Sequence, residues 1–104
     1  MAEHWVDVGA EEDLAQRPLV ADADGIGIVV VRCAEGDFAI EDRCTHDGEA
    51  LGGGEVEDCE IICPRHFARF CLKTGEPLSP PAYEPVHTYP VRTENGRVLV
   101  QIPD

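Results

Sequence analysis

Basic residues are scarce in this chain of 104 residues, and their scarcity excludes several kinds of partner. Eight Lys and Arg stand against 21 Asp and Glu, which leaves a formal net charge of −13 at pH 7. Such a surface repels phosphate backbones, so the sequence predicts no nucleic-acid partner. It favours a basic protein partner and keeps the chain in solution, and the charge alone does not separate these two uses.

Long apolar runs are also missing. The longest one outside the glycines is Ile28 to Val31, whereas a helix that spans a membrane needs roughly 20 residues. The first residues, Met1 to Asp7, show no basic segment followed by an apolar one, so no secretory signal is expected. These absences predict a cytoplasmic protein with no membrane partner.

The chain has five cysteines, an odd number. Disulfides are not expected in a reducing compartment, so thiolate chemistry is the better use for some of these residues. Three of them, Cys33, Cys59 and Cys71, belong to no ligand motif and are expected to be small, buried apolar side chains.

Helix signals are few, and strand signals recur between turn residues. The best helical stretch, Ala10 to Gln16, covers less than two turns before Arg17-Pro18 ends it. The Asn95-Gly96 pair predicts a hairpin turn, because both residue types tolerate a positive φ. Alternation and β-branched residues predict strands over Gly25–Cys33, Asp37–Glu41, Val86–Arg92 and Arg97–Ile102, with Val98, Val100 and Ile102 on one face of the last.

The middle of the chain, from about residue 43 to 81, is rich in glycine and proline and has only short strand-like pieces, Glu60–Ile62 and Arg69–Leu72. We expect a loop-rich subdomain inserted between the earlier and later strands, which needs a staple to be ordered. The fold class predicted for residues 1–104 is therefore all-β. It is a single domain, a small antiparallel sandwich or open barrel with a site built from loops.

The candidate staple consists of Cys44-Thr45-His46 and Cys63-Pro64-Arg65-His66, which are separated by sixteen residues. Each motif offers one thiolate and one imidazole. Two sulfurs and two nitrogens can hold a tetrahedral zinc, as in a zinc-stapled interaction module, or the two ends of an iron–sulfur cluster. The Cys-x-His spacing is tight for two ligands on one small ion. It favours a cluster in which the cysteine binds one iron and the histidine binds the other.

These residues resemble the two cluster-binding loops of Rieske proteins. The first loop corresponds to Cys44 through Leu51, and the second begins at Cys63-Pro64-Arg65-His66, followed by Phe70, Gly75 and the proline pair Pro80-Pro81 of a covering loop. The resemblance runs from about Asp37 to the C-terminus. It implies the all-β Rieske fold and one [2Fe–2S] cluster per chain. Cys44 and Cys63 would then bind one iron, and His46 and His66 the other, with electrons passing through the exposed edges of the histidines.

The chain departs from the high-potential Rieske proteins at several positions. Glu49 and Arg65 replace the extra loop cysteines of the cytochrome bc complexes, which excludes the disulfide between the loops. Ala68 and Phe70 stand where those proteins carry a Ser and a Tyr hydroxyl, so a low-potential member is expected. Phe67 replaces the glycine most common after the second histidine, which leaves the conformation of that loop open.

The short chain resembles the stand-alone ferredoxins of bacterial ring-hydroxylating dioxygenase systems, which are monomeric electron carriers without catalysis of their own. That resemblance implies a flavin-dependent ferredoxin reductase and a terminal oxygenase as partners. The alternative is the small Rieske-like subunit of an NADH-dependent nitrite reductase. Half of the basic residues lie close to the predicted ligands in the sequence: Arg43, Arg65, Arg69 and Lys73. They either offset the acidic loop or contact a partner, and Arg65 is the best candidate for such a contact.

Overall fold

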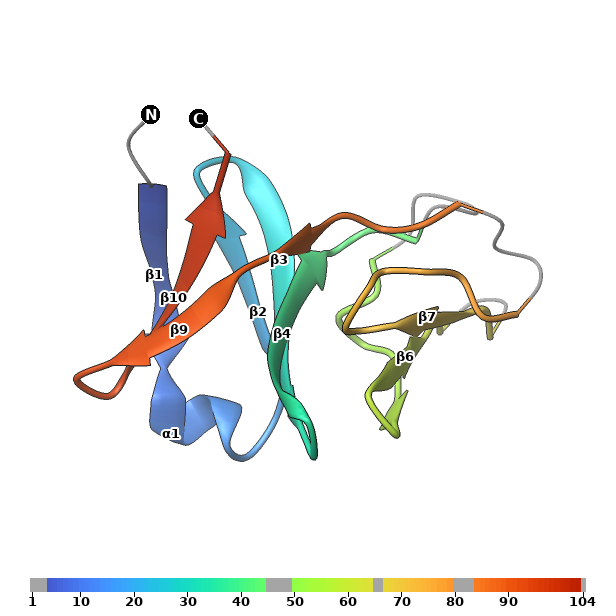
Figure 1. The fold of residues 1–104 in the computed structure, drawn as a ribbon, viewed down its shortest axis with the longest axis horizontal. Helices are drawn as coiled ribbons and strands as arrows, with labels where there is room; N and C mark the ends of the chain where they lie inside the picture. Colours follow the sequence, from blue (N-terminus) through green and yellow to red (C-terminus); the bar gives the residue numbers. More distant parts are fainter. Residues whose placement is uncertain (1–3, 45–49, 65–66, 80–83, 104) are drawn as a thin grey trace.

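The structure is a computed structural model that describes residues 4–44, 50–64, 67–79 and 84–103. Within these residues it consists almost entirely of antiparallel strands in three sheets (Figure 1), which confirms the all-β prediction. The elements are β1 (His4–Ala10), α1 (Glu11–Leu14), β2 (Leu19–Ala23), β3 (Ile26–Cys33), β4 (Gly36–Glu41), β5 (Val56–Glu57), β6 (Glu60–Ile62), β7 (Arg69–Cys71), β8 (Thr88–Tyr89), β9 (Val91–Glu94) and β10 (Arg97–Ile102).

Two of the sheets form a base, drawn on the left of Figure 1, where both ends of the chain also lie. One sheet has the strand order β1-β10-β9 and the other β2-β3-β4-β8. Side chains from both sheets and from α1 share one apolar core, and β10 contributes the alternating face expected from its sequence. The buried members are Leu14, Ala23, Ile28, Val30, Ala39, Val98, Val100 and Ile102.

The C-terminal hairpin forms as its turn residues predicted. Asn95 and Gly96 have φ values of 51° and 77°, and β9 pairs with β10 across them. The single strand expected over Val86–Arg92 is instead two strands, because the chain changes sheets at Pro90. β8 pairs with β4 in one sheet and β9 pairs with β10 in the other. A proline suits this crossing, since it has no N–H to donate to a ladder.

β3 is buried on both of its faces, which explains its unbroken apolar run. Ile28 and Val30 point into the base core, whereas Val29 and Val31 belong to a second core. A strand covered on both sides is expected to lack a polar face. The strand is central in its sheet, because it lies between β2 and β4.

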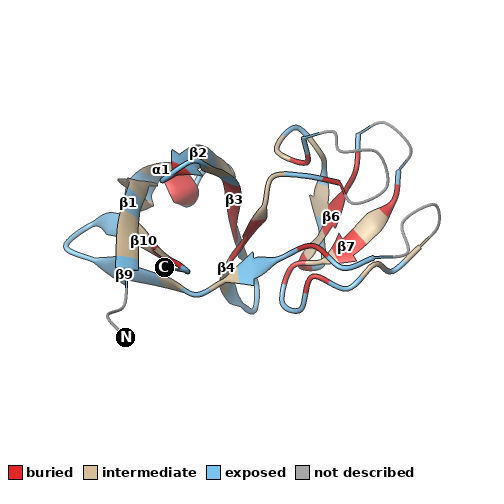
Figure 2. Cartoon of the chain, turned by 90° about the horizontal axis from the view of Figure 1, so that it is seen from above, coloured by how far each residue is buried: buried red, intermediate tan, exposed pale blue. Residues whose placement is uncertain are grey.

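The second core lies between β3–β4 and the small sheet β5-β6-β7, and it holds the loop-rich part of the chain against the base (Figure 2). This small unit lies to the right in Figure 1. Its buried members come from both sides of the junction and include two cysteines: Val29, Val31, Ile40, Cys44, Leu51, Ile61, Cys63, Ala68, Phe70, Leu72 and Val86.

A disulfide crosses the same junction and corrects the expectation for two cysteines. Cys33, at the end of β3, is bonded to Cys59, in the turn between β5 and β6, with their Cα atoms 5.5 Å apart. Cys71 is not in a disulfide, but it is half-buried and not fully enclosed. Burial is confirmed for Cys59. The prediction that Cys33 and Cys59 are unbonded was wrong, because it judged each cysteine by its neighbours in the chain. The tertiary fold places residues 26 positions apart side by side.

We expect the Cys33→Ser, Cys59→Ser double variant to lose about 3.5 kcal/mol of unfolding free energy, the chain-entropy value for a loop of this length. For a domain of this size the thermal midpoint should fall by at least ~10 °C. Circular dichroism of the cluster-loaded protein, with and without dithiothreitol, measures the change. Reductant should shift the wild type toward the double variant and leave the double variant unmoved. An identical midpoint in all four samples would show that the disulfide does not form.

Candidate metal centre

Two of the four predicted ligands lie within the described residues, and both are in the second core. Cys44 follows β4 and Cys63 follows β6 directly. Both are fully buried, and neither is in a disulfide. The other two, His46 and His66, lie outside the described residues. Cys44 and Cys63 thus follow two separate strands and belong to one apolar cluster.

The donors present fit an iron–sulfur cluster. A cysteine thiolate is a soft ligand for iron or zinc, and burying it without a cation is costly. Cys44 and Cys63 supply two such sulfurs from two loops of one core. Within the described part of the chain no group of three or more His, Cys, Asp or Glu side chains could hold a metal ion.

Backbone hydrogen bonds close the loop that begins at Cys63. Its N–H donates to the carbonyl of Ala68 at 2.7 Å, and its carbonyl accepts the N–H of Phe67 at 2.9 Å. Phe67 closes this turn with φ at 60°, the left-handed conformation that glycine adopts most readily. The bulkier residue therefore keeps a glycine-like backbone, and Phe67 as a whole is 73% exposed.

The segment that leads to the predicted covering loop is held beside the same turn. The Leu78 N–H donates to the carbonyl of Arg69 at 2.7 Å, and the Arg69 N–H donates to the Ser79 hydroxyl at 3.1 Å. Pro80 and Pro81, which follow, lie outside the described residues. The start of that loop is thus fixed to β7, next to the Cys63 turn.

Ala68 and Phe70, which replace the two hydroxyl residues, are both fully buried in the core that contains the two thiols. Neither side chain can donate a hydrogen bond to a sulfur. A donor there would stabilise the more negative, reduced state, so its absence lowers the potential.

We therefore expect a potential near the lower end of the Rieske range, about −150 mV. The Ala68→Ser, Phe70→Tyr double variant should have a higher one. If each hydroxyl favours the reduced state by ~1 kcal/mol, the shift is about 40 mV for each. Protein-film voltammetry measures it, and an Ala68→Gly variant, which adds no donor, is the control. A fall in potential would show that these positions do not face the cluster sulfurs.

Two of the basic residues near the predicted ligands are paired with carboxylates. Arg69 contacts Glu57 at 3.1 Å and Glu60 at 3.2 Å, and these hydrogen bonds raise the pKa of its guanidinium. Lys73 contacts Glu35 at 2.8 Å, which likewise raises the pKa of its ammonium. Arg69 therefore offsets the acidic loop, one of the two roles predicted for it. Arg65 lies outside the described residues.

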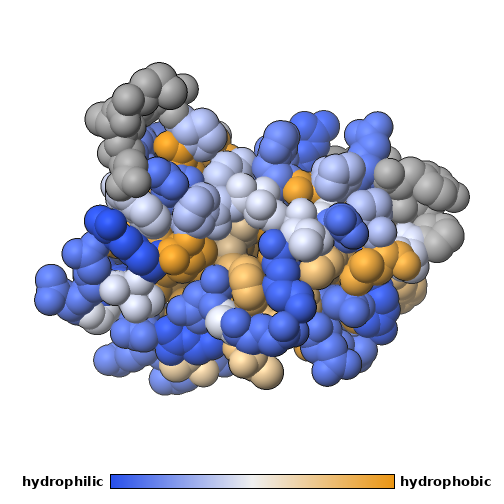
Figure 3. Space-filling model, viewed as in Figure 1, coloured by the Kyte–Doolittle hydropathy of each residue, from blue (hydrophilic) through white to orange (hydrophobic). Residues whose placement is uncertain are grey.

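A shallow depression adjoins Cys63 and is bordered by the exposed ring of Phe67. It is lined by Gly53, Gly54, Glu55, Ile62, Cys63, Pro64 and Phe67. On the face drawn in Figure 3, hydrophobic side chains form separate patches in a largely hydrophilic surface.

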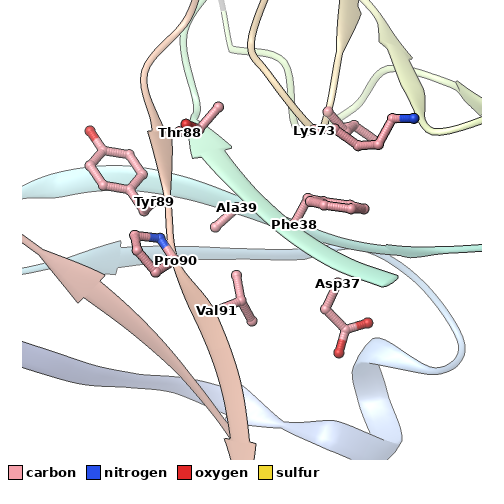
Figure 4. Close-up of a pocket in the computed structure, with 9 residues that line it drawn as sticks. Asp37, Phe38, Ala39, Lys73, Thr88, Tyr89, Pro90 and Val91 are labelled. Atoms are coloured by element: carbon pink, nitrogen blue, oxygen red, sulfur yellow. The ribbon is translucent and has the colours of Figure 1, made fainter. Parts of the chain in front are cut away.

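A second groove lies where β4, β8 and β9 meet the turn after β7 (Figure 4). Phe38 and Lys73 lie on one side of it, and Tyr89 and Pro90 on the other. Its described lining contains neither cysteine nor histidine, the two ligand types of the predicted centre: Asp37, Phe38, Ala39, Leu72, Lys73, Thr88, Tyr89, Pro90 and Val91.

Two buried thiols in one apolar core of an all-β fold are typical of a metal–thiolate protein. The comparison with protein families identifies it further. Residues 4–90 match the Rieske [2Fe-2S] domain, and the chain belongs to this family. It accordingly carries one [2Fe–2S] cluster. No helix in the described residues is long and apolar enough to cross a membrane.

Known relatives are similar in sequence and in structure. The 3-phenylpropionate/cinnamic acid dioxygenase ferredoxin subunit of Escherichia coli (strain K12) is 44% identical over 68 residues, which cover 64% of each chain. The aligned part thus spans less than two thirds of that relative's length. The ferredoxin of carbazole 1,9a-dioxygenase from Nocardioides aromaticivorans IC177 is 33% identical, with a TM-score of 0.82 over 92% of this chain and 95% of that one.

Two further structures bear on possible partners. A chain in a complex of reduced oxygenase and oxidized ferredoxin in carbazole 1,9a-dioxygenase is 30% identical, with a TM-score of 0.85 over 93% of this chain and 92% of that one. A putative nitrite reductase NADPH small subunit has a TM-score of 0.79 at 19% identity, which shows the shared fold alone. The nitrite reductase alternative is therefore the weaker one.

Proposed function

We propose that this chain is a one-electron carrier of a ring-hydroxylating dioxygenase system, with no catalysis of its own. The observation that carries the proposal is the pair of fully buried cysteines, Cys44 and Cys63, in a chain of the Rieske family. The relatives named as dioxygenase ferredoxins support it. A zinc-stapled module would use the same thiols but has no support from these relatives.

The proposed ligands are Cys44 and Cys63 for one iron and His46 and His66 for the other. When bound, the cluster supplies a one-electron couple whose potential is raised by the two imidazoles relative to four-thiolate clusters. We further propose that residues 1–104 form a single Rieske domain whose cluster-binding subdomain covers approximately residues 43–81. Cys63 lies in the apolar second core, and backbone hydrogen bonds close the loop that begins at it.

Metal analysis tests this proposal directly. The purified protein should be red-brown, with two irons and two acid-labile sulfides per chain and a rhombic electron paramagnetic resonance signal on reduction. When an oxygenase component reoxidises the reduced protein, the oxidised spectrum should return. The carrier by itself should form no product. A colourless protein with one zinc per chain would refute the proposal.

The proposed partners are a terminal oxygenase, as in the neighbouring complex, and a flavin-dependent reductase. The net charge of −13 gives long-range attraction to a basic patch on a partner. Close contact would be made at the loop end, where Phe67 is exposed and where Arg65 remains the predicted charged contact. Electron-transfer partners bury small interfaces, so a monomeric carrier with modest affinity is expected.

Salt should therefore slow electron transfer. Raising the ionic strength from about 0.01 to 0.15 M shortens the Debye length from ~30 to ~8 Å and weakens attraction between the two proteins. The second-order rate of reduction by the partner reductase should fall, while the absorption spectrum stays unchanged. Stopped-flow mixing measures the rate, with a small uncharged reductant as the control. Rates that are independent of salt would contradict electrostatic steering.

We propose a cytoplasmic location, and the Cys33–Cys59 disulfide makes this testable because disulfides are rare there. Cells are quenched with an alkylating agent before lysis, and the chain is then denatured. A disulfide closed in the cell leaves three cysteines to alkylate, Cys44, Cys63 and Cys71. Alkylation of all five shows the reduced form, which fits the cytoplasm, whereas three would contradict that location.

A further inference from the structure

The stretch between the two cysteine loops contains a short connection that contacts both of them. We name residues 51–55 the bridging segment. It begins at Leu51, which is fully buried in the second core, and it runs to Glu55 just before β5. The N–H of Gly54 donates to the carbonyl of Leu51 at 2.9 Å, so the segment is a closed turn with a set length.

Asp42 holds the first end of the bridging segment. One oxygen of its carboxylate, Oδ1, accepts the N–H of Leu51 at 2.7 Å and the N–H of Gly52 at 2.8 Å. Hydrogen bonds to an ionised carboxylate are stronger than those between neutral groups. Asp42 is itself fixed to the base, since its N–H donates to the carbonyl of Gly27 in β3 at 2.8 Å. It stands two residues before Cys44 in the chain.

The other end of the bridging segment lies against the residue that precedes Cys63. The N–H of Ile62 donates to the carbonyl of Glu55 at 2.9 Å. Gly54 lies so close to Ile62 that a Cβ placed on it would be 1.9 Å from the Ile62 carbonyl oxygen. The contact is backbone against backbone, so its distance cannot be adjusted by a change of side-chain rotamer.

We propose that Asp42 is a positioning residue that sets, through the bridging segment, the separation of the Cys44 and Cys63 sulfurs. A continuous series of contacts runs from Asp42 over Leu51 and Gly52 to Glu55 and Ile62. Each end of the series is one or two residues from a cysteine. The inference rests on the proposed function, in which these two sulfurs bind one iron, and adds a residue that no ligand motif contains.

Removal of the carboxylate tests this role. In Asp42→Ala, a chelator should extract iron about tenfold faster than from the wild type. Removing a residue that orients a metal ligand commonly lowers metal affinity by about tenfold or more. The electron paramagnetic resonance g-values of the cluster-loaded protein should also shift, because the two sulfurs that would hold the iron would be displaced. Asp42→Asn keeps an amide oxygen at the same place and should restore the g-values and most of the iron retention.

Asp22 provides a matched control in the base. Its Oδ1 accepts the N–H of Gly25 at 2.6 Å, in the turn between β2 and β3, which contains neither cysteine. Asp22→Ala removes the same kind of contact, and it should lower the thermal midpoint without changing the g-values or the rate of iron loss. A general loss of stability would act on both variants alike and is thereby separated from positioning.

Hydrogen-exchange mass spectrometry of residues 50–55 provides a readout independent of the cluster. Exchange in this peptide should accelerate in Asp42→Ala and remain slow in Asp22→Ala, with or without iron. If Asp42→Ala does not fold, Asp42→Asn must still exchange faster there than the wild type, because its hydrogen bonds are uncharged. The inference would be overturned if Asp42→Ala kept the g-values and the iron release of the wild type. It would also be overturned if exchange in residues 50–55 were the same in Asp42→Ala and Asp22→Ala as in the wild type. A wild type without iron would instead refute the proposed function.

Discussion

Cys63→Ala is expected to remove the cluster completely, so that the purified variant is colourless and contains neither iron nor labile sulfide. A methyl group cannot bind iron, and the side chain is fully buried, so water has no ready access to replace the sulfur. Because the cluster also orders the loops around it, the variant should lose much of its stability, as metal-binding domains commonly do without their metal. Cys44→Ala should behave in the same way.

Cys71→Ala is the matched control for this loss. Cys71 is half-buried, is not in a disulfide and lies in β7 of the same small sheet. Burial alone would raise the pKa of its thiol, but hydrogen bonds from Thr74 and Lys73 and the Lys73 ammonium together lower it. It is thus a thiol with a ligand-like tendency that is not a proposed ligand, and its removal should leave two irons per chain. Full iron content in Cys63→Ala would disprove the proposed ligand set.

Gly54→Ala is expected to lower both the stability and the iron content of the protein. The added methyl group would lie 1.9 Å from the Ile62 carbonyl oxygen, so the backbone just before Cys63 must move. Overpacking of this kind costs about 3 kcal/mol at the upper end of its usual range. The variant should therefore unfold at a lower temperature and be purified with less than half of its iron, as measured by calorimetry and metal analysis.

Gly53→Ala separates this steric effect from a general sensitivity of the turn. Gly53 is the neighbouring residue, is exposed, and has nothing within 4 Å of the position that a Cβ would take. It should retain wild-type iron content and thermal midpoint. Equal behaviour of the two alanine variants would contradict the close contact between Gly54 and Ile62.

Local patterns in the sequence were enough to predict several elements of the base. The β-branched run of β3, the alternation in β10 and the Asn95-Gly96 turn each depend on residues that are adjacent or two apart. The strands β1 and β2 were not predicted. β1 is ordered by pairing with β10, at the opposite end of the chain, through a register that shifts between Asp7 and Gly9. A pairing partner so distant leaves little trace in the local pattern.

The candidate metal centre was accessible from the sequence for a similar reason. Ligands on one loop must be close in the chain, so Cys44 with His46 and Cys63 with His66 form recognisable motifs. Their joint placement in one core required the fold, and for the two cysteines the structure shows it. The low-potential prediction also depended on residue types alone, since an alanine or a phenylalanine has no hydroxyl wherever it lies.

By itself, then, the sequence determined the fold class, the family and the identity of the proposed ligands, because each depends on residue chemistry at short spacing. Only the tertiary structure decided that Cys33 is bonded to Cys59 and that Asp42 holds the turn at Leu51 and Gly52. Those contacts join positions 26, 9 and 10 residues apart. Their formation depends on how β3 and β4 pack against the small sheet, and no spacing rule relates a disulfide or a carboxylate–amide contact to such separations.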